Sequence, residues 1–126
     1  MQIQGKWNLL FIGDEESKFN SNTEALSELF LNVDKTFDKE ESLKFFDEKA
    51  YDIVLCDMSV DPTRLAWLKQ MKDIKAEQTF FALVDPKDTA KLYGIADLGV
   101  NAFELTPEQF DQALQMIADF DPYSKN

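Results

Sequence analysis

The sequence predicts a single α/β domain over residues 1–126, in which one doubly wound, five-stranded parallel sheet carries helices on both faces. Short runs such as WNLLFI and FFALV are apolar throughout, and strands of that kind need cover on both faces. Between the runs, apolar residues recur at helical spacing, so strands and helices alternate along the chain. A chain of 126 residues is long enough to bury a core and suits one domain.

The first part of the chain predicts two strand–helix pairs. A buried strand over 7–12 ends at Gly13. Apolar residues then follow at the spacing of one helix face: Phe19, Leu26, Leu29, Phe30 and Val33. After a short strand over 35–37, Asp38 lies three residues before Glu41, which is the spacing of a capping box at a helix start. The apolar residues of that second helix are Leu43, Phe46 and Ala50.

The middle of the chain predicts two further pairs. The run YDIVLCDM contains the third strand, at 52–56. Asp61-Pro62 then combines an N-cap residue with a proline at the first helical position. The apolar residues of the helix that it opens are Leu65, Leu68, Met71 and Ile74. The fourth strand covers 80–84, and Asp85-Pro86 repeats the helix-start signal for a helix that ends before Gly99.

The last pair is a short strand over 102–105 and a final helix. Thr106 is the expected N-cap, Pro107 the first helical residue, and Gln109 stands at the capping-box position. The residues that this helix is expected to bury are Phe110, Leu114, Ile117 and Ala118. The predicted order of elements is therefore βαβαβαβαβα.

The composition argues against several classes of function. The formal charge is 13 − 24 = −11, which repels nucleic-acid phosphates and anionic lipid, so we expect neither nucleic acid nor membrane as a partner. The chain has no histidine, which excludes Ser-His-Asp and Cys-His nucleophiles and most zinc sites. The one cysteine, Cys56, lies in an apolar run and is expected to fill the core. Because no apolar run reaches membrane-spanning length and the first residues lack a signal-peptide pattern, we expect a cytoplasmic protein.

Acidic residues follow two strands that would be neighbours in such a sheet. Asp14 follows the first strand, and Asp57 follows the apolar run of the third. Ligands of open parallel sheets bind outside the carboxyl ends of the strands. Two converging carboxylates repel each other unless a cation lies between them, and Mg²⁺ takes oxygen ligands. The pattern predicts a divalent-metal pocket, but it is equally compatible with aspartates that only cap helices or start loops.

Four segments together resemble the receiver domain of two-component response regulators, of the chemotaxis-regulator type. LLFIGDEES resembles the first strand with its acidic residues, and YDIVLCDM the third strand with its phosphate-accepting aspartate. FFALVD resembles the fourth strand, and LGVNAFELTP the segment that usually reads Gly-Ala-x-x-Tyr/Phe-Leu-x-Lys-Pro. The resemblance covers nearly the whole chain, although the segment 57–84 looks a few residues short. It implies a flavodoxin-like, receiver-type fold.

The resemblance also assigns roles to residues of this chain. Asp57 falls on the phosphoacceptor, and Asp14 on an acid that ligates Mg²⁺. Ser59 falls on the position whose backbone carbonyl also ligates the metal, so that Asp14, Asp57 and Ser59 form the implied Mg²⁺ site. Phe103 falls on the aromatic position that moves when the domain switches.

Three positions depart from the family pattern. Gly13 replaces the first acid of the acidic pair, and Val84 replaces the threonine or serine whose hydroxyl holds the phosphoryl group. Thr106 replaces the lysine that pairs with the phosphoryl oxygens. Because these changes remove hydrogen-bond donors and a positive charge, we expect weak or absent phosphorylation of Asp57 and an impaired switch.

Three functions remain open at this stage. The first is an atypical receiver domain, not an enzyme, that docks to a histidine kinase, a phosphotransfer protein or an output protein. Its docking face would hold Tyr93, Phe103 and Phe110, although core packing is the better explanation for Tyr93 and Phe110. The second is a functional phosphoacceptor with unusual kinetics. The third is a flavodoxin-like small-molecule binder, against which the single glycine of GDEES argues, since no Gly-rich phosphate loop follows the first strand.

Overall fold

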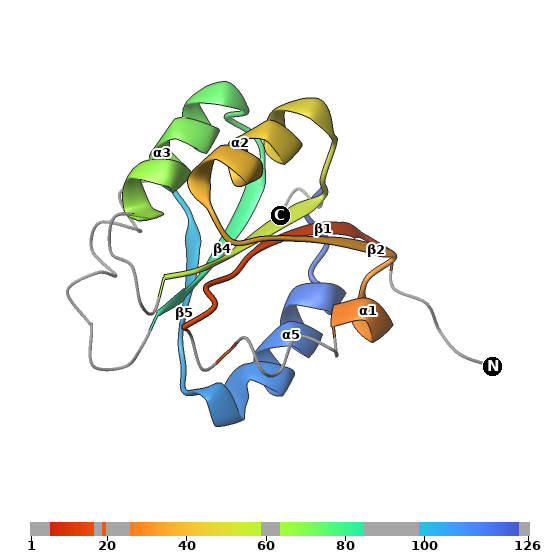
Figure 1. The fold of residues 1–126 in the computed structure, drawn as a ribbon. Helices are drawn as coiled ribbons and strands as arrows, with labels where there is room; N and C mark the ends of the chain where they lie inside the picture. Colours follow the sequence, from red (N-terminus) through yellow and green to blue (C-terminus); the bar gives the residue numbers. More distant parts are fainter. Residues whose placement is uncertain (1–5, 17–18, 20–25, 59–63, 85–98, 124–126) are drawn as a thin grey trace.

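A computed structural model describes residues 6–16, 19, 26–58, 64–84 and 99–123, and its centre is a five-stranded parallel sheet (Figure 1). The strands are β1 (Asn8–Ile12), β2 (Asn32–Thr36), β3 (Ile53–Asp57), β4 (Thr79–Val84) and β5 (Asn101–Glu104). They lie in the order β2-β1-β3-β4-β5, and every adjacent pair is parallel. The predicted fold class is confirmed, and so is the placement of β1 beside β3.

Helices cover both faces of the sheet, as the apolar strands require (Figure 1). The described helices are α1 (Leu26–Leu29), α2 (Lys39–Glu48), α3 (Arg64–Ile74) and α5 (Phe110–Asp119), with a 3₁₀ turn, η2 (Pro107–Gln109), before α5. Helices α2 and α3 lie on one face, and α1 and α5 on the other. Within the described ranges, no helix combines the length and the apolar character that crossing a bilayer would need.

Alternation along the strands divides the apolar side chains between two cores. Leu9 and Phe11 of β1 face the core that α1 and α5 close, while Leu10 and Ile12 face the core beneath α2 and α3. Phe110 of α5 is fully buried in the first core. Phe110 is therefore a core residue, which confirms the structural alternative for this position.

Hydrogen bonds are present at two of the predicted helix starts. The Asp38 side chain accepts from the backbone N–H of Glu41 at 2.8 Å, which caps α2. Gln109 Oε1 accepts from the backbone N–H of Thr106 at 2.9 Å, which is one half of the predicted capping box. The other half is missing, because Pro107–Gln109 form a 3₁₀ turn and α5 begins at Phe110. Gly99 has a φ of 72°, the left-handed conformation typical of a helix end. The predicted starts Asp61-Pro62 and Asp85-Pro86, the helix between 85 and 98 and Tyr93 lie outside the described residues.

Three predictions about individual residues need correction. Val33 is not on a helix face but in β2, which begins at Asn32, three residues before the predicted strand start at Lys35. As an edge strand with exposed polar residues, β2 lacks the apolar run that marks the central strands. Ala50 lies beyond α2 and is exposed. Ala118 is only partly buried.

Candidate functional site

The carboxyl ends of β1, β3 and β4 bring the predicted site residues to one edge of the sheet. The register pairs Ile12 with Cys56, so Asp57 lies level with the turn that follows β1 and carries Asp14. Asp57 is 1% exposed and pairs with Leu83, one residue before Val84. The structure therefore places Asp14, Asp57 and Val84 at the same edge, as the strand order predicts.

A buried arginine occupies this edge. Arg64, the first residue of α3, is 3% exposed, and its Nη2 lies 3.5 Å from Oδ2 of Asp14. Its Nη1 donates to the backbone carbonyls of Asp57 at 3.1 Å and Ile12 at 3.3 Å. Nη2 also donates to the carbonyl of Phe37 at 3.3 Å. One guanidinium thus joins the ends of β1 and β3 to the residue after β2.

Sequence reasoning missed Arg64, although the sequence contains a signal for it. It is the only arginine in a chain whose other basic residues are lysines. A guanidinium offers five N–H donors in a rigid fork and is hydrated more weakly than an ammonium group, so it is the basic group best suited to burial. Its carbon atom also lies 4.7 Å from the centre of the Trp67 ring. Trp67 is half-buried.

Asp14 is held by contacts on both carboxylate oxygens. Oδ1 accepts from the backbone N–H of Glu16 at 2.9 Å, while Oδ2 faces Arg64. The first contact is a local turn that a loop aspartate commonly makes. The second is an ion pair with a buried cation, which a helix cap or loop residue does not need. The arrangement favours a site over a purely local role for Asp14.

The position of the missing acid is closed by aromatic rings. Gly13 is buried, and a Cβ placed on it would lie 2.8 Å from a ring carbon of Phe11 and 3.2 Å from one of Phe37. A side chain at position 13 therefore requires both rings to move. The rings of Phe11 and Phe37 thus occupy the space that an acidic side chain at position 13 would need.

The three remaining predicted positions surround the edge without supplying a positive charge. Val84 is fully buried at the end of β4. The Thr106 hydroxyl lies 3.4 Å from Oε1 of Gln109. Phe103 of β5 is half-buried, and its ring centre lies 5.6 Å from that of Phe81. Ser59 lies outside the described residues.

The donor set at this edge does not fit Mg²⁺ as it stands. A divalent ion would need the carboxylate of Asp14 and oxygen atoms near Asp57, and the Arg64 guanidinium already contacts both residues. In the part of the chain that is described, no three His, Cys, Asp or Glu side chains form a group able to hold a metal ion. Within the described residues, the cation that the structure places against the Asp14 carboxylate is the Arg64 guanidinium.

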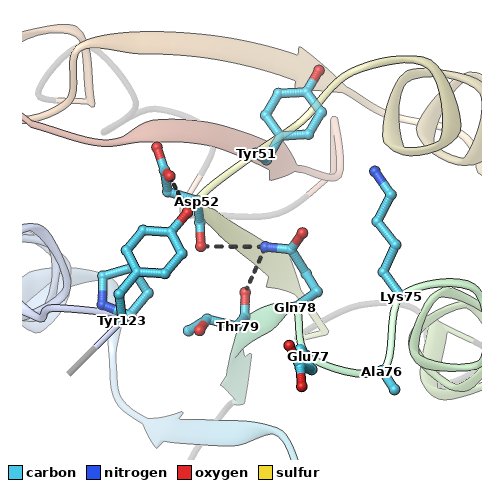
Figure 2. A pocket seen from close by; sticks show the side chains of 9 residues that line it. Tyr51, Asp52, Lys75, Ala76, Glu77, Gln78, Thr79 and Tyr123 are labelled. Carbon is cyan, nitrogen blue, oxygen red and sulfur yellow. Dashed lines mark hydrogen bonds between the residues drawn. The ribbon is translucent and has the colours of Figure 1, made fainter. Parts of the chain in front are cut away.

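A polar pocket of about 340 Å³ lies at the opposite, amino-terminal edge of the sheet (Figure 2). Its lining includes Asp52, Gln78, Thr79 and Tyr123. Asp52 accepts from the backbone N–H of Asn8 at 2.8 Å and from the Tyr123 hydroxyl. Gln78 donates to the carbonyls of Asp52 at 3.2 Å and Thr79 at 3.4 Å, so its amide joins the starts of β3 and β4.

The Tyr123 hydroxyl has an altered acidity because it is hydrogen-bonded to a carboxylate. The bond to Asp52 is the main reason that the pKa of Tyr123 rises to about 12, with partial burial adding to it. Ionising the phenol would place two negative charges against each other. The group therefore stays a neutral donor at physiological pH, and the pocket carries no reactive phenolate.

Comparison with known proteins shows similarity in structure but not in sequence. No protein-family model matches the chain, and no curated protein sequence matches it. The structure is similar to the non-phosphorylated HemR receiver domain from Leptospira biflexa, with a TM-score of 0.74 and 17% identity, covering 91% of this chain and 96% of that one. It is also similar to the response regulator TrrA from Thermotoga maritima in complex with Mg²⁺-BeF, with a TM-score of 0.71 and 18% identity, covering 89% and 96%.

A third similar structure is a CheY-like receiver domain from Methanospirillum hungatei. Its TM-score is 0.69 at 13% identity, and the alignment covers 89% of this chain and 93% of that one. The three alignments cover nearly the full length of this chain and of each neighbour. The protein therefore has the fold of response-regulator receiver domains, as its motifs predict.

Proposed function

We propose that residues 1–126 form one receiver-like signalling domain that acts by docking to a protein partner, with weak or absent phosphorylation at Asp57. The receiver fold supports the signalling role. The observation that carries the proposal is the carboxyl edge itself, where Arg64 is buried against Asp14 and Asp57 while Val84 and Thr106 stand at the phosphate-contact positions.

Phosphoryl transfer to a carboxylate depends on positioned donors and neutralising charge. Val84 has no donor, and each missing hydrogen bond to a charged group forgoes roughly 1.5–3 kcal/mol. The Thr106 hydroxyl is uncharged and lies beside Gln109. Mg²⁺ binding by Asp14, Asp57 and Ser59 remains a prediction from the family resemblance, and the Arg64 guanidinium competes with it. A phosphoryl group on Asp57 would thus find little of the support that the reaction needs.

The same substitutions remove the means of switching. A ligand shifts a conformational equilibrium only when it contacts the two states differently. Val84 has no hydroxyl that could move toward a phosphoryl group on Asp57. Phosphorylation would therefore open no space into which the Phe103 ring could move. We infer a domain with one resting conformation, whose docking surface is always presented.

We propose a docking surface on β5 and α5, together with the helix that the sequence predicts at 85–98. Met116 of α5 is 63% exposed and Phe120, just beyond the helix, 41%. The expected partners are a histidine kinase, a phosphotransfer protein or an output protein. The acidic charge of −11 favours a partner with a basic face and disfavours nucleic acid and membranes. In this proposal the domain is cytoplasmic and has no catalytic activity of its own.

Phosphorylation is tested by incubating the protein with acetyl phosphate and Mg²⁺ and measuring its intact mass. We expect no phosphoryl adduct, or a minor one, that is absent from Asp57→Ala. A typical receiver domain treated in parallel shows that the reagent is active. An adduct on most of the wild-type chain that depends on Asp57 would favour the alternative, a functional phosphoacceptor with unusual kinetics.

Docking is tested once a partner has been identified by cross-linking in the source cell. We expect Asp57→Asn to leave the Kd unchanged and Met116→Glu to weaken it about tenfold, which is about 1.4 kcal/mol. Gln112→Glu adds the same charge at another exposed residue of α5 and serves as the control. Binding that requires phosphorylated Asp57 would overturn the docking proposal.

A further inference from the structure

The side chain of Arg64 is a buried cation with a large set of oxygen contacts. It is 3% exposed, pairs with the Asp14 carboxylate at 3.5 Å and donates to the carbonyls of Ile12, Asp57 and Phe37. Burying a charge is costly unless it is paired and hydrogen-bonded. The carboxyl edge therefore gives the Arg64 guanidinium one carboxylate and three carbonyl acceptors, while its Nε has no hydrogen-bond partner among the described residues.

These contacts come from the place where a parallel sheet gathers negative charge. Strand ends point carbonyl oxygens outward at this edge, and Asp14 adds a carboxylate. Oxygen atoms of this kind also suit a hard divalent ion such as Mg²⁺. Two cations in contact with the same oxygen atoms would repel each other strongly, because the dielectric screening inside a protein is low. The guanidinium and a metal ion thus exclude each other.

We propose that Arg64 is a built-in cation that takes the place of a divalent metal ion at the carboxyl edge of the sheet. The wild-type protein then binds no Mg²⁺ between Asp14 and Asp57, and the Asp14 carboxylate is paired with a positive charge at any metal concentration. This inference goes beyond the proposed docking function and does not depend on any partner.

The attachment of Arg64 makes the replacement permanent. The residue begins α3, and its guanidinium lies over Trp67 of the same helix. A bound ion can dissociate, whereas a side chain held by its own helix and by three strand ends cannot leave while the domain is folded. The charge at the carboxyl edge is therefore set by Arg64 and does not depend on metal binding.

The test is a Mg²⁺ titration of the wild type and four variants, one of them Asp14→Asn, by isothermal titration calorimetry. We expect no saturable binding to wild type, and a Mg²⁺ site at least about tenfold tighter in Arg64→Met, equivalent to about 1.4 kcal/mol or more. Lys69→Met removes a positive charge from an exposed position of the same helix and should behave as wild type. The double variant Arg64→Met/Asp14→Asn should lose the gained site.

Two results of this titration would overturn the proposal. The first is Mg²⁺ binding to wild type that Asp14→Asn abolishes. The second is a folded Arg64→Met variant whose Mg²⁺ affinity equals that of Lys69→Met. Either result leaves the docking proposal intact, because the titration is made on the isolated chain and docking is measured on the complex.

A second measurement applies even where Arg64→Met does not fold. If Arg64 neutralises the acidic edge, Asp14→Asn leaves a buried guanidinium without its carboxylate, and the Tm should fall by several degrees. Glu15→Gln neutralises the adjacent, exposed acid and should leave the Tm unchanged. An Asp14→Asn variant whose Tm is unchanged or raised would show that repulsion between uncompensated acids prevails, and would refute the inference.

Discussion

The two edges of the sheet hold their aspartates with different kinds of partner. At the amino edge, Asp52 accepts from the backbone N–H of Asn8 and from the neutral Tyr123 hydroxyl. At the carboxyl edge, Asp14 faces the charged guanidinium of Arg64. The difference follows from the direction of the strands. Parallel strands present N–H groups at their starts and carbonyl oxygens at their ends. An acid therefore finds donors in the strand backbone at the amino edge, whereas at the carboxyl edge the backbone donor of Asp14 comes from the following turn, at Glu16.

This contrast explains why a cation is needed at only one edge. Asn8 supplies its N–H at the start of β1, whereas Ile12 supplies only its carbonyl at the end. A carboxylate at the carboxyl edge therefore adds negative charge to a place that already has it. In our proposal Arg64 resolves this conflict in the present protein, whereas the similar structure of TrrA is a complex with Mg²⁺-BeF.

The largest effect is expected from removing the cation. Arg64→Met leaves the Asp14 carboxylate and three carbonyls without their buried donor, and breaking such a buried pair costs about 3 kcal/mol of unfolding free energy. Urea unfolding followed by circular dichroism measures the loss. Lys69→Met, with the same charge change at an exposed site, should cost less than about 0.5 kcal/mol. Equal losses of unfolding free energy in the two variants would mean that the buried contacts of Arg64 do not stabilise the fold.

The next largest effect is expected where the family acid is missing. Gly13→Asp should destabilise the protein by about 2 kcal/mol, because its Cβ would overlap the rings of Phe11 and Phe37. Gly13→Ala tests the Cβ alone and should carry most of the loss. A Gly13→Asp variant as stable as wild type would show that the rings yield easily and that the family acid can be restored.

A smaller effect is expected from neutralising the acid at the amino edge. Asp52→Asn keeps one oxygen that can accept from the backbone N–H of Asn8, and its NH₂ group replaces the oxygen that faces Tyr123. Because that NH₂ group can donate to the Tyr123 hydroxyl, the cost should stay below about 1 kcal/mol. Thermal unfolding of Asp52→Asn and Asp14→Asn side by side makes the comparison direct. A larger fall in Tm for Asp52→Asn than for Asp14→Asn would contradict the conclusion that Asp14 has a charged partner and Asp52 neutral ones.

The smallest effect is a pH dependence at the amino edge. The pKa of Tyr123 is raised to about 12 in the folded protein, above the value of about 10 for a free tyrosine. Its contribution to stability is therefore full below pH ~10 and is lost as the pH rises toward 12. Tyr123→Phe should flatten this part of the stability curve, measured by urea unfolding between pH 9 and roughly 11.5. Since Tyr123 is largely exposed, solvent screening keeps the effect small.

The sequence predicted the central strands well because their pattern is local. β1, β3 and β4 are apolar along their length, and their ends fall within one residue of the predicted ranges. The edge strand β2 was misplaced because its residues are polar and its pairing with β1 is decided by the sheet. The capping pattern at Asp38 was confirmed for the same reason that the strands were, since the contact is made within four residues.

The candidate site was predictable in its acids but not in its cation. Asp14 and Asp57 are marked by their places at strand ends, which the strand order turns into proximity. Arg64 donates to the backbone carbonyls of Ile12, Phe37 and Asp57. Ile12 and Phe37 lie far from Arg64 in the sequence, so no local sequence pattern predicts these contacts. The filling of the space at Gly13 likewise depends on Phe37, which follows a different strand. The one sequence feature that sets Arg64 apart is that it is the only arginine of the chain.

The most direct measurement is a crystal structure of the wild-type protein and of Arg64→Met, each soaked in Mn²⁺, which replaces Mg²⁺ at oxygen sites and has an anomalous signal. Our account predicts no anomalous peak between Asp14 and Asp57 in wild type, with the guanidinium in its place, and a peak there in Arg64→Met. A Mn²⁺ peak at this edge in wild type, with Arg64 displaced from its carbonyl partners, would contradict it.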